Sequence, residues 1–162
     1  MITVFVDGAC SGNPGFGNWG FVAVDSETDK VVAAAAGDGL EWTTNNEMEL
    51  TAILVALKIY GVNQDAFQYP VVYTDSNYAY KTLTEWYHSW KRNGWKRSKN
   101  QPVANLELIQ EYDAIWESGK RIELQWVRGH NGNRGNCLAD QLATGKITNL
   151  EEAKKFWDTF IK

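Results

Sequence analysis

The 162-residue chain is 44% hydrophobic and 22% charged, which suits one globular domain and leaves no apolar stretch long enough to span a membrane. Its two cysteines are too few for a disulfide framework, and the N-terminus lacks the basic region of a signal peptide, so we expect a cytoplasmic protein rather than a secreted one. The net charge of −4, taken as an average, argues weakly against a partner as acidic as nucleic acid.

The first part of the chain predicts three consecutive strands followed by a helix. Residues 2–7 are apolar on both faces of a two-residue period, as in a central strand that is covered on both sides. The glycine-rich residues 11–20 are interpreted as a loop, and the patterns at 21–24 and 30–37 predict two strands joined by a polar turn. A capping-box spacing then starts a helix that we expect over 44–60, because glycine and proline are absent from it.

A fourth strand is expected at residues 70–74, and Ser76 is placed to cap a helix that runs toward Glu85. The next residues, 86–100, hold five basic side chains and no acidic one, so the rest of the chain has a net charge of −9. The basic residues are Lys91, Arg92, Lys96, Arg97 and Lys99. Such a run is often only a solvated face, but tryptophans lie among these residues, and basic residues beside aromatic ones suit a phosphate-bearing ligand.

The last part of the chain completes an α/β pattern. A helical apolar face runs over residues 103–118, and residues 122–127 predict a fifth strand. The glycine-rich residues 129–136 lead into a helix that contains Asp140, and an amphipathic tail follows at 149–161. Because helices and strands alternate after three consecutive strands, we expect a mixed sheet.

Four acids occupy positions where an unpaired charge is costly. Asp7 and Asp75 each end an apolar strand, and both emerge at the same edge of the sheet if the two strands are parallel neighbours. Glu49 lies in a largely apolar helix with no Lys or Arg within one turn, where burying its charge costs several kcal/mol unless a partner neutralises it. Asp140 repeats this pattern near a helix start.

Taken singly, each of these acids is better explained as a helix cap or a turn former. Taken together, four carboxylates favour a cation site. Ligands that are all oxygen suit Mg²⁺ or Mn²⁺ better than zinc, and a carboxylate cluster that holds a pair of such ions is a device for phosphoryl transfer.

His130 lies in the glycine-rich loop between Gly129 and Gly132, so it does not read as a core histidine. With a pKa near neutrality it can take a proton from an attacking water or give one to a leaving oxygen. A surface histidine without a role is the alternative, and the sequence leaves both open.

Four motifs in this order resemble the ribonuclease H family of bacterial type one: DGACSGNPG, TNNEMEL, YTDS, and GHNG followed by NCLAD. The resemblance implies an α/β fold of the ribonuclease H type, a five-stranded mixed sheet with helices on both faces. It implies a catalytic domain over residues 1–145, in which residues 86–100 form a basic protrusion. The tail at 146–162 is not part of the motif set, and we expect it to pack on the same domain as an amphipathic helix.

The resemblance also implies the activity, which is sequence-independent hydrolysis of the RNA strand of an RNA–DNA hybrid. Two Mg²⁺ ions, for which Mn²⁺ can substitute, would be bound by Asp7, Glu49, Asp75 and Asp140, and His130 would assist as a catalytic residue. Hydrolysis in line at phosphorus would leave 5′-phosphate and 3′-hydroxyl ends. We expect a monomer with no obligate protein partner.

Contacts with the hybrid are implied by the same motifs. The residues expected at the RNA strand, in the minor groove, are Cys10, Asn13, Asn45 and Asn77, and those expected at the DNA strand are Thr44, Asn46 and Trp86. Short polar side chains can read the 2′-hydroxyl without reading the bases, which fits cleavage without sequence preference. The five basic residues of the protrusion would bind the hybrid backbone.

Two other functions stay open at this point. One is another enzyme of the same fold, such as a transposase or a junction resolvase, which cleavage of double-stranded DNA would reveal. The other is a hybrid-binding module without catalysis, against which the retention of four acids argues.

Overall fold

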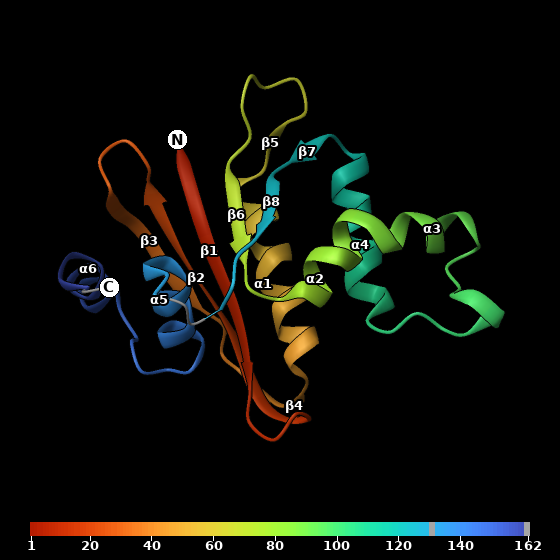
Figure 1. Cartoon of the computed structure of the whole chain (residues 1–162), viewed down its shortest axis with the longest axis horizontal. Helices are drawn as coiled ribbons and strands as arrows, with labels where there is room; N and C mark the ends of the chain where they lie inside the picture. Colours follow the sequence, from red (N-terminus) through yellow and green to blue (C-terminus); the bar gives the residue numbers. More distant parts are fainter. Residues whose placement is uncertain (130–131, 161–162) are drawn as a thin grey trace.

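A computed structural model of the chain describes residues 1–129 and 132–160 (Figure 1). Its elements in chain order are β1 (Ile2–Cys10), β2 (Gly15–Asp25), β3 (Lys30–Ala36), β4 (Leu40–Thr43), α1 (Asn45–Tyr60), β5 (Val62–Asn63), β6 (Val71–Thr74), α2 (Asn77–Lys81), a π-helical turn (Thr82–Trp86), α3 (Tyr87–Arg92), a 3-10 turn (Ser98–Asn100), α4 (Leu106–Glu117), β7 (Lys120–Arg121), β8 (Glu123–Trp126), α5 (Arg134–Ala143) and α6 (Leu150–Thr159). No helix within these two ranges is both long and apolar enough to cross a membrane.

The main sheet is mixed, as the sequence predicts. Its five-stranded path has the order β3-β2-β1-β6-β8, and the short strand β4 pairs with β2 outside this path. The pairs β1–β2 and β2–β3 are antiparallel, whereas β1–β6 and β6–β8 are parallel. The predicted five-stranded mixed sheet of an α/β fold is therefore confirmed, and β4 is an addition that the sequence pattern does not predict.

Helices cover both faces of this sheet, and β2 shows why. Phe21 and Ala23 belong to the hydrophobic cluster that includes the buried side of α1, while Val22 and Val24 belong to the cluster formed with α5 and α6. Because successive side chains of a strand point to opposite faces, the continuous apolar run at residues 21–24 of β2 fills both clusters at once. Figure 1 shows α5 and α6 lying together at one side of the sheet.

The parallel pair β1–β6 brings Asp7 level with Asp75, which follows the end of β6; the prediction that Asp7 ends its strand is wrong, because pairing with β2 continues β1 to Cys10. Phe5 is the register partner of Tyr73, so the chain reaches Asp7 and Asp75 after the same number of further residues along the two strands. The condition under which the sequence places Asp7 and Asp75 together, that the two strands are parallel neighbours, is therefore met, and this pairing sets the level at which the candidate site forms.

The prediction of a loop over residues 11–20 is wrong in its second half, because β2 begins at Gly15. The glycines there allow close packing. A Cβ atom on Gly20 would lie 2.7 Å from the backbone nitrogen of Ala143 in α5, and one on Gly17 would lie 2.6 Å from the Cγ2 atom of Thr43 in β4. These glycines therefore act as places where other elements approach the strand, and not as turn residues.

The helix expected after Ser76 is longer than predicted. The hydroxyl oxygen of Ser76 accepts a hydrogen bond from the backbone N–H of Ala79 at 3.0 Å and caps α2. From the end of α2 at Lys81 the chain continues through the π-helical turn, which contains Glu85, into α3, so the first basic residues lie on a helix. One nearly continuous helical segment thus leads from the strand end at Asp75 to the basic protrusion.

The tail forms α6, whose N-cap is Asn149. Ala153 and Trp157 are buried and lie in the same hydrophobic cluster as Val31 of β3 and Leu138 of α5. The helix therefore packs on the sheet face that α5 also covers.

Candidate active site

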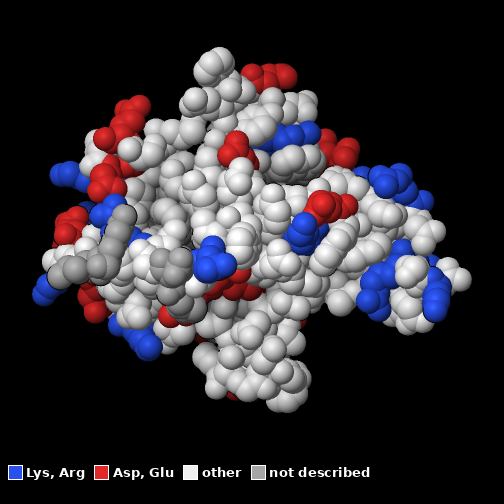
Figure 2. Space-filling model, viewed as in Figure 1, with Lys and Arg blue, Asp and Glu red and all other residues white. Residues whose placement is uncertain are grey.

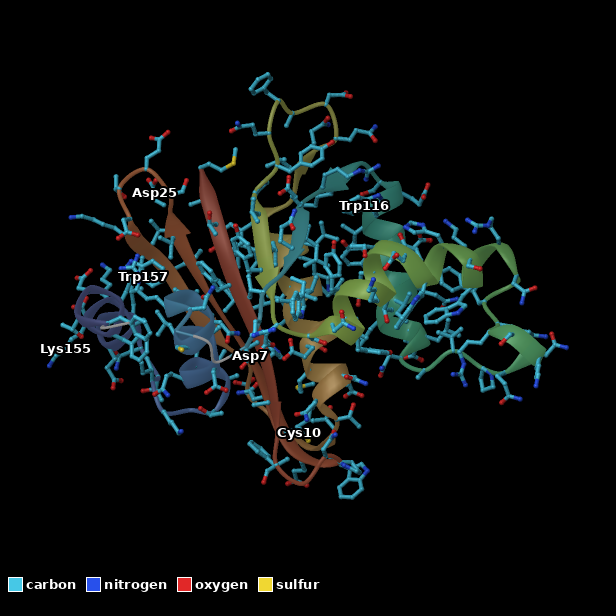
Figure 3. The ribbon with its side chains drawn as sticks, in the orientation of Figure 1. Asp7, Cys10, Asp25, Trp116, Lys155 and Trp157 are labelled. Atoms are coloured by element: carbon cyan, nitrogen blue, oxygen red, sulfur yellow. The ribbon has the colours of Figure 1, made fainter. Side chains whose placement is uncertain are left out.

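Four carboxylates from four elements meet at the edge of the sheet. Asp7 lies on β1, Glu49 on the second turn of α1, Asp75 directly after β6, and Asp140 on α5. All four line one cleft of about 390 Å³. The other lining residues are Gly8, Ala9, Cys10, Asn45, Asn46 and Ser76. Figure 3 shows Asp7 at the centre of the molecule, where β1 passes between α5 and α1.

Three of the four acids form a compact group. One carboxylate oxygen from each of Asp7, Glu49 and Asp75 lies within 4.8 Å of the other two. Oxygen ligands on opposite sides of one Mg²⁺ are about 4 Å apart, so small side-chain movements suffice to close this group around such an ion. Asp140 lines the same cleft, and its side chain contributes to raising the pKa of Asp7.

Glu49 reaches the cleft because β1 lets α1 approach closely. The backbone N–H of Gly8 donates to the Oε1 atom of Glu49 at 3.0 Å, and the hydroxyl of Thr74 donates to its Oε2 atom at 3.4 Å. A Cβ atom at position 8 would overlap the backbone nitrogen of Glu49, so glycine is required at this crossing. Two neutral donors thus orient the carboxylate without neutralising it.

Burial, followed by the charge of Glu49, raises the pKa of Asp7 far above its ordinary value. Burial also raises the pKa of Glu49, although the hydrogen bond from protonated Asp7 and those from Gly8 and Thr74 oppose this rise. Without a cation, the pair therefore retains a proton that two isolated carboxylates would release. Among the described residues that line the cleft there is no Lys or Arg, so a metal ion fits the site as the missing positive charge.

The residues expected at the RNA strand lie at one end of this cleft or near it. The thiol of Cys10 donates to the carbonyl oxygen of Thr43 at 3.2 Å, and the side-chain oxygen of Asn13 accepts a hydrogen bond from the backbone N–H of Asn45 at 2.9 Å. The first contact ties β1 to β4, and the second ties the β1–β2 turn to the start of α1. Asn77 stands apart as the exposed first residue of α2, directly after Ser76.

The residues expected at the DNA strand lie in two separate places in the structure. Thr44 is the N-cap of α1, and its hydroxyl oxygen accepts from the backbone N–H of Glu47 at 3.1 Å. Asn46 lines the cleft. Trp86, with 43% of its surface exposed, lies away from both at the end of the π-helical turn.

A second hollow, here called the basic groove, lies beside α3 and has a volume of about 1030 Å³. Its lining residues are Trp86, Ser89, Trp90, Arg92, Asn93, Lys96, Arg97, Ser98, Lys99 and Gln101. Figure 2 shows Lys and Arg side chains gathered at this end of the molecule. Four of the five basic residues of the protrusion therefore share one concave surface with two tryptophans.

Lys91 is the exception among the five. Its Nζ atom lies 2.9 Å from the Oδ2 atom of Asp113 and 3.6 Å from the Oε1 atom of Glu117, both on α4. Asp113 is only 8% exposed, so this lysine neutralises a charge that the fold buries. The hydrogen bond with Asp113 raises the pKa of Lys91, and it fastens α3 to α4. Lys91 is therefore already paired within the protein.

His130 lies outside the described residues, so its predicted role stays a prediction. Its neighbour Gly129 is described, and a Cβ atom there would lie 2.6 Å from the Oδ2 atom of Asp75. The loop after β8 therefore passes against the site before residue 130.

Sequence reasoning missed two contributors to the site. Thr74 is fully buried, donates to Glu49, and accepts from the backbone N–H of Ser76 at 3.1 Å. A polar residue at the end of an otherwise apolar strand was the signal for it. The pairing of Asp113 with Lys91 left no local signal, because the two residues belong to different helices.

Known proteins resemble this chain in both sequence and fold. The sequence model of the RNase H family matches residues 1–148. A curated protein named Ribonuclease H from Herminiimonas arsenicoxydans is 45% identical over 145 residues, which cover 88% of this chain and 91% of that protein. Another of the same name from Dichelobacter nodosus is 40% identical over 156 residues, covering 94% of this chain and 95% of that one.

Solved structures agree with the fold. LC9-RNase H1, described as a type 1 RNase H with the type 2 active-site motif, has a TM-score of 0.69 and 30% identity, and the match covers 89% of this chain and 70% of that one. LC11-RNase H1, solved in complex with an RNA/DNA hybrid, has a TM-score of 0.62 and 21% identity, with 90% and 95% of the two chains covered. At that identity the second likeness supports the fold alone.

The raised pKa of Asp7 predicts how stability depends on pH when no metal is bound. The folded state holds the proton of Asp7 at pH values where the unfolded state, with a pKa of about 3.9, has lost it. This contribution to stability is therefore complete in acid and is lost as the pH rises. Asp7→Asn removes the effect, so in a chelator the variant should melt a few degrees above the parent near neutral pH, at about 2 to 4 °C per kcal/mol.

Thermal melts followed by circular dichroism over a pH series check this expectation. The difference between variant and parent should shrink as the pH falls through about 4 and disappear below it, where Asp7 is protonated in both states. Asp158→Asn, which changes an exposed acid on α6, should follow the parent at every pH. A metal-free Asp7→Asn protein that melted well below the parent at neutral pH would contradict the prediction.

Proposed function

This chain belongs to the ribonuclease H family of nucleases, and we propose that it hydrolyses the RNA strand of RNA–DNA hybrids, independently of sequence, with two Mg²⁺ ions. The proposed products carry 5′-phosphate and 3′-hydroxyl ends. One observation carries the proposal: Asp7, Glu49, Asp75 and Asp140 come from four separate elements and meet in a cleft whose described lining contains no basic residue.

The carboxylate cluster suits a pair of divalent cations. When bound, the two ions activate a water for in-line attack on phosphorus and stabilise the leaving 3′-oxygen. Asp7 occupies the centre of the cluster, in contact with both Glu49 and Asp140, and is therefore the residue best placed to serve both ions. Glu49 is held in place by Gly8 and Thr74, so its carboxylate does not have to reorient on binding. Four ionised carboxylates together carry as much negative charge as two divalent cations carry positive charge.

Recognition of RNA is assigned to the end of the cleft near α1. Cys10 and Asn45 line the cleft beside the carboxylates, the Cys10 thiol donates to the carbonyl oxygen of Thr43, and the Asn13 side chain accepts from the backbone N–H of Asn45. Polar groups in this position can contact 2′-hydroxyls in the minor groove, a contact that DNA does not offer, and Asn77 is proposed to add to them from α2. Thr44 and Asn46 are proposed to contact the DNA strand.

The basic groove is proposed as a second contact with the hybrid backbone. It gathers Arg92, Lys96, Arg97 and Lys99 beside Trp86 on the helical segment that leaves the cleft at Asp75. Because the rest of the chain is acidic, a local concentration of positive charge is needed to overcome repulsion by the phosphates. His130 is proposed, from the sequence alone, to assist proton transfer.

We further propose that the chain acts as a cytoplasmic monomer without an obligate protein partner. Cys10 and Cys137 are free thiols, which suits a reducing compartment. Light scattering on the purified protein should give the mass of one chain, and a mass of two chains at working concentration would contradict this.

The proposed activity predicts a definite pattern of substrates. Labelled RNA–DNA hybrid, double-stranded RNA and double-stranded DNA are incubated with and without Mg²⁺, and only the hybrid with Mg²⁺ should be cut, in its RNA strand. Kinase labelling of the fragments only after phosphatase treatment identifies 5′-phosphate ends. Cleavage of double-stranded DNA would instead favour a transposase or a resolvase.

In the same assay, Asp75→Asn should lower the rate by about three orders of magnitude or more, because it removes ligand charge, worth several kcal/mol, without changing shape. Hybrid binding should largely persist, since phosphate contacts lie elsewhere. Asp158→Asn serves as the matched control, because it makes the same substitution at an exposed site on α6. Undiminished turnover by Asp75→Asn would overturn the assignment of the cleft.

The basic groove predicts a salt-dependent binding defect. Replacing Arg92, Lys96, Arg97 and Lys99 by Ala should weaken hybrid binding strongly at low salt and leave the saturated rate nearly unchanged. The slope of log affinity against log salt should become shallower by about 0.7 to 0.9 for each phosphate that the variant no longer neutralises. Binding is measured by fluorescence anisotropy over a salt series. An unchanged slope with normal affinity would show the groove to be a solvated face.

Lys91→Ala is the control for this experiment, because it removes a charge from the same segment outside the groove. It should leave the salt slope unchanged and lower the melting temperature, since it leaves Asp113 buried without its cation. If the slope in Lys91→Ala instead becomes shallower by as much as one groove residue accounts for, the pairing with Asp113 does not withhold Lys91 from the substrate.

A further inference from the structure

Arg134, the first residue of α5, is held by two segments that are distant in sequence. Its guanidinium lies over the indole ring of Trp157 at 3.5 Å from the ring centroid, and one of its nitrogens donates to the carbonyl oxygen of the same residue at 3.3 Å. Its other terminal nitrogen pairs with the Oδ1 atom of Asp29 at 2.6 Å. The side chain thus connects α5 with α6 and with the turn between β2 and β3.

Trp157 is itself fixed in position. It is 4% exposed, and its indole N–H donates to the backbone carbonyl of Asp29 at 2.9 Å. Its ring also packs near Phe5 of β1, with centroids 6.0 Å apart. Figure 3 shows Trp157 at the side of the molecule where α6 lies beside α5. We call the group of Arg134, Trp157 and Asp29 the Arg134 clamp.

The first turn of α5 has little freedom between this clamp and the sheet. A Cβ atom at Gly135 would overlap the ring of Phe5, so the helix backbone rests directly on that ring. Asn133 caps the helix by accepting a hydrogen bond from the backbone N–H of Asn136 at 2.8 Å. The start of α5 is therefore held on one side by β1 and on the other by α6.

The Arg134 clamp is connected to the candidate active site by α5. Asp140 follows Arg134 by less than two helical turns, over which an α-helix transmits a displacement nearly as a rigid rod. Phe5 and Asp7 are two residues apart on β1 and so project from the same face. A shift of α5 relative to Phe5 thus changes the distance between Asp140 and Asp7.

We propose that α6 is a positioning element for Asp140, acting through the Arg134 clamp, and not only a packing helix. The proposal rests on the proposed function, in which Asp140 is a ligand of one of the two ions. The three other carboxylates are carried by β1, α1 and the end of β6, where Arg134 makes none of its described contacts. Loosening the clamp should therefore weaken the binding of one metal ion and leave the other nearly unaffected.

The test measures metal binding by the full chain without substrate. Mg²⁺ and Mn²⁺ are titrated by calorimetry into the parent, Arg134→Ala and Arg134→Lys, and the Mg²⁺ midpoint of hybrid cleavage is measured in parallel. Arg134→Ala should weaken one of the two sites about three- to tenfold, less than the 10- to 100-fold typical when a group bonded to a ligand is removed. Arg134→Lys keeps the positive charge, so its metal affinity should lie between those of the parent and Arg134→Ala. The rate at saturating Mg²⁺ and the KM for the hybrid should stay close to those of the parent.

A control variant separates positioning from general loss of stability. Val31→Ala makes a cavity in the cluster that contains Trp157, without touching Arg134. All variants are compared at a temperature where melts show them folded, which the partly exposed side chain of Arg134 favours. Val31→Ala should leave metal binding unchanged. If it weakens metal binding as much as Arg134→Ala does, stability explains the effect and the proposal is overturned.

Asp140→Asn distinguishes failure of this inference from failure of the proposed function. It should weaken the same metal site, and adding Arg134→Ala to it should cause no further loss, because the positioned ligand is already gone. If Asp140→Asn weakens metal binding and Arg134→Ala does not, only the positioning role fails. If Asp140→Asn binds both ions like the parent, the ligand role of Asp140 fails, and the inference fails with it.

Discussion

The burial of Asp7 beside Glu49 is the constraint to which the rest of the molecule is fitted. Two carboxylates in contact repel each other and lose hydration, and both costs must be offset by a shared proton or by a cation. The fold supplies geometry instead of countercharge: Gly8 lets α1 approach β1, and Thr74 and the Gly8 N–H orient Glu49. Without a metal, the folded state is therefore less stable than it would be without these two carboxylates in contact. In return, the carboxylates are already arranged for a cation.

An acidic centre creates a second problem, because the substrate of a ribonuclease H is also acidic. The two kinds of charge lie in separate regions of the molecule. Negative charge, which suits cations, lies in the cleft, and positive charge, which suits phosphates, lies in the basic groove. The helical segment from Asn77 to Arg92 connects the two regions. The link between Lys91 and Asp113 fastens this segment to α4, so one basic residue is used to hold the groove while the others line it.

The sheet face that α5 and α6 cover affects the candidate active site through the position of α5. There α5 lies on Phe5 and Gly20, close enough that neither Gly135 nor Gly20 could carry a side chain without displacing a neighbour. Such close approach makes the place of Asp140 depend on what holds α5 from outside, which is α6. The tail that forms α6 is in this way joined to α5 and to the turn between β2 and β3 by specific contacts as well as by apolar packing.

By itself the sequence determined the order of the main strands and helices and the motifs that point to the family, because periodicity, capping and motif spacing are local properties of the chain. Strand pairing decided that β1 and β6 are parallel neighbours and that β1 continues past Asp7. Sequence reasoning misassigned Gly15–Gly20 as a loop and left β4 unpredicted, since these glycines are explained by α5 and β4 packing on the strand and not by their neighbours in sequence. Only the tertiary structure decided that Lys91 is paired while Arg92 lines the groove, and that Arg134 meets Trp157. Those contacts join residues on separate elements, and their partners are chosen by packing, on which local sequence carries no information.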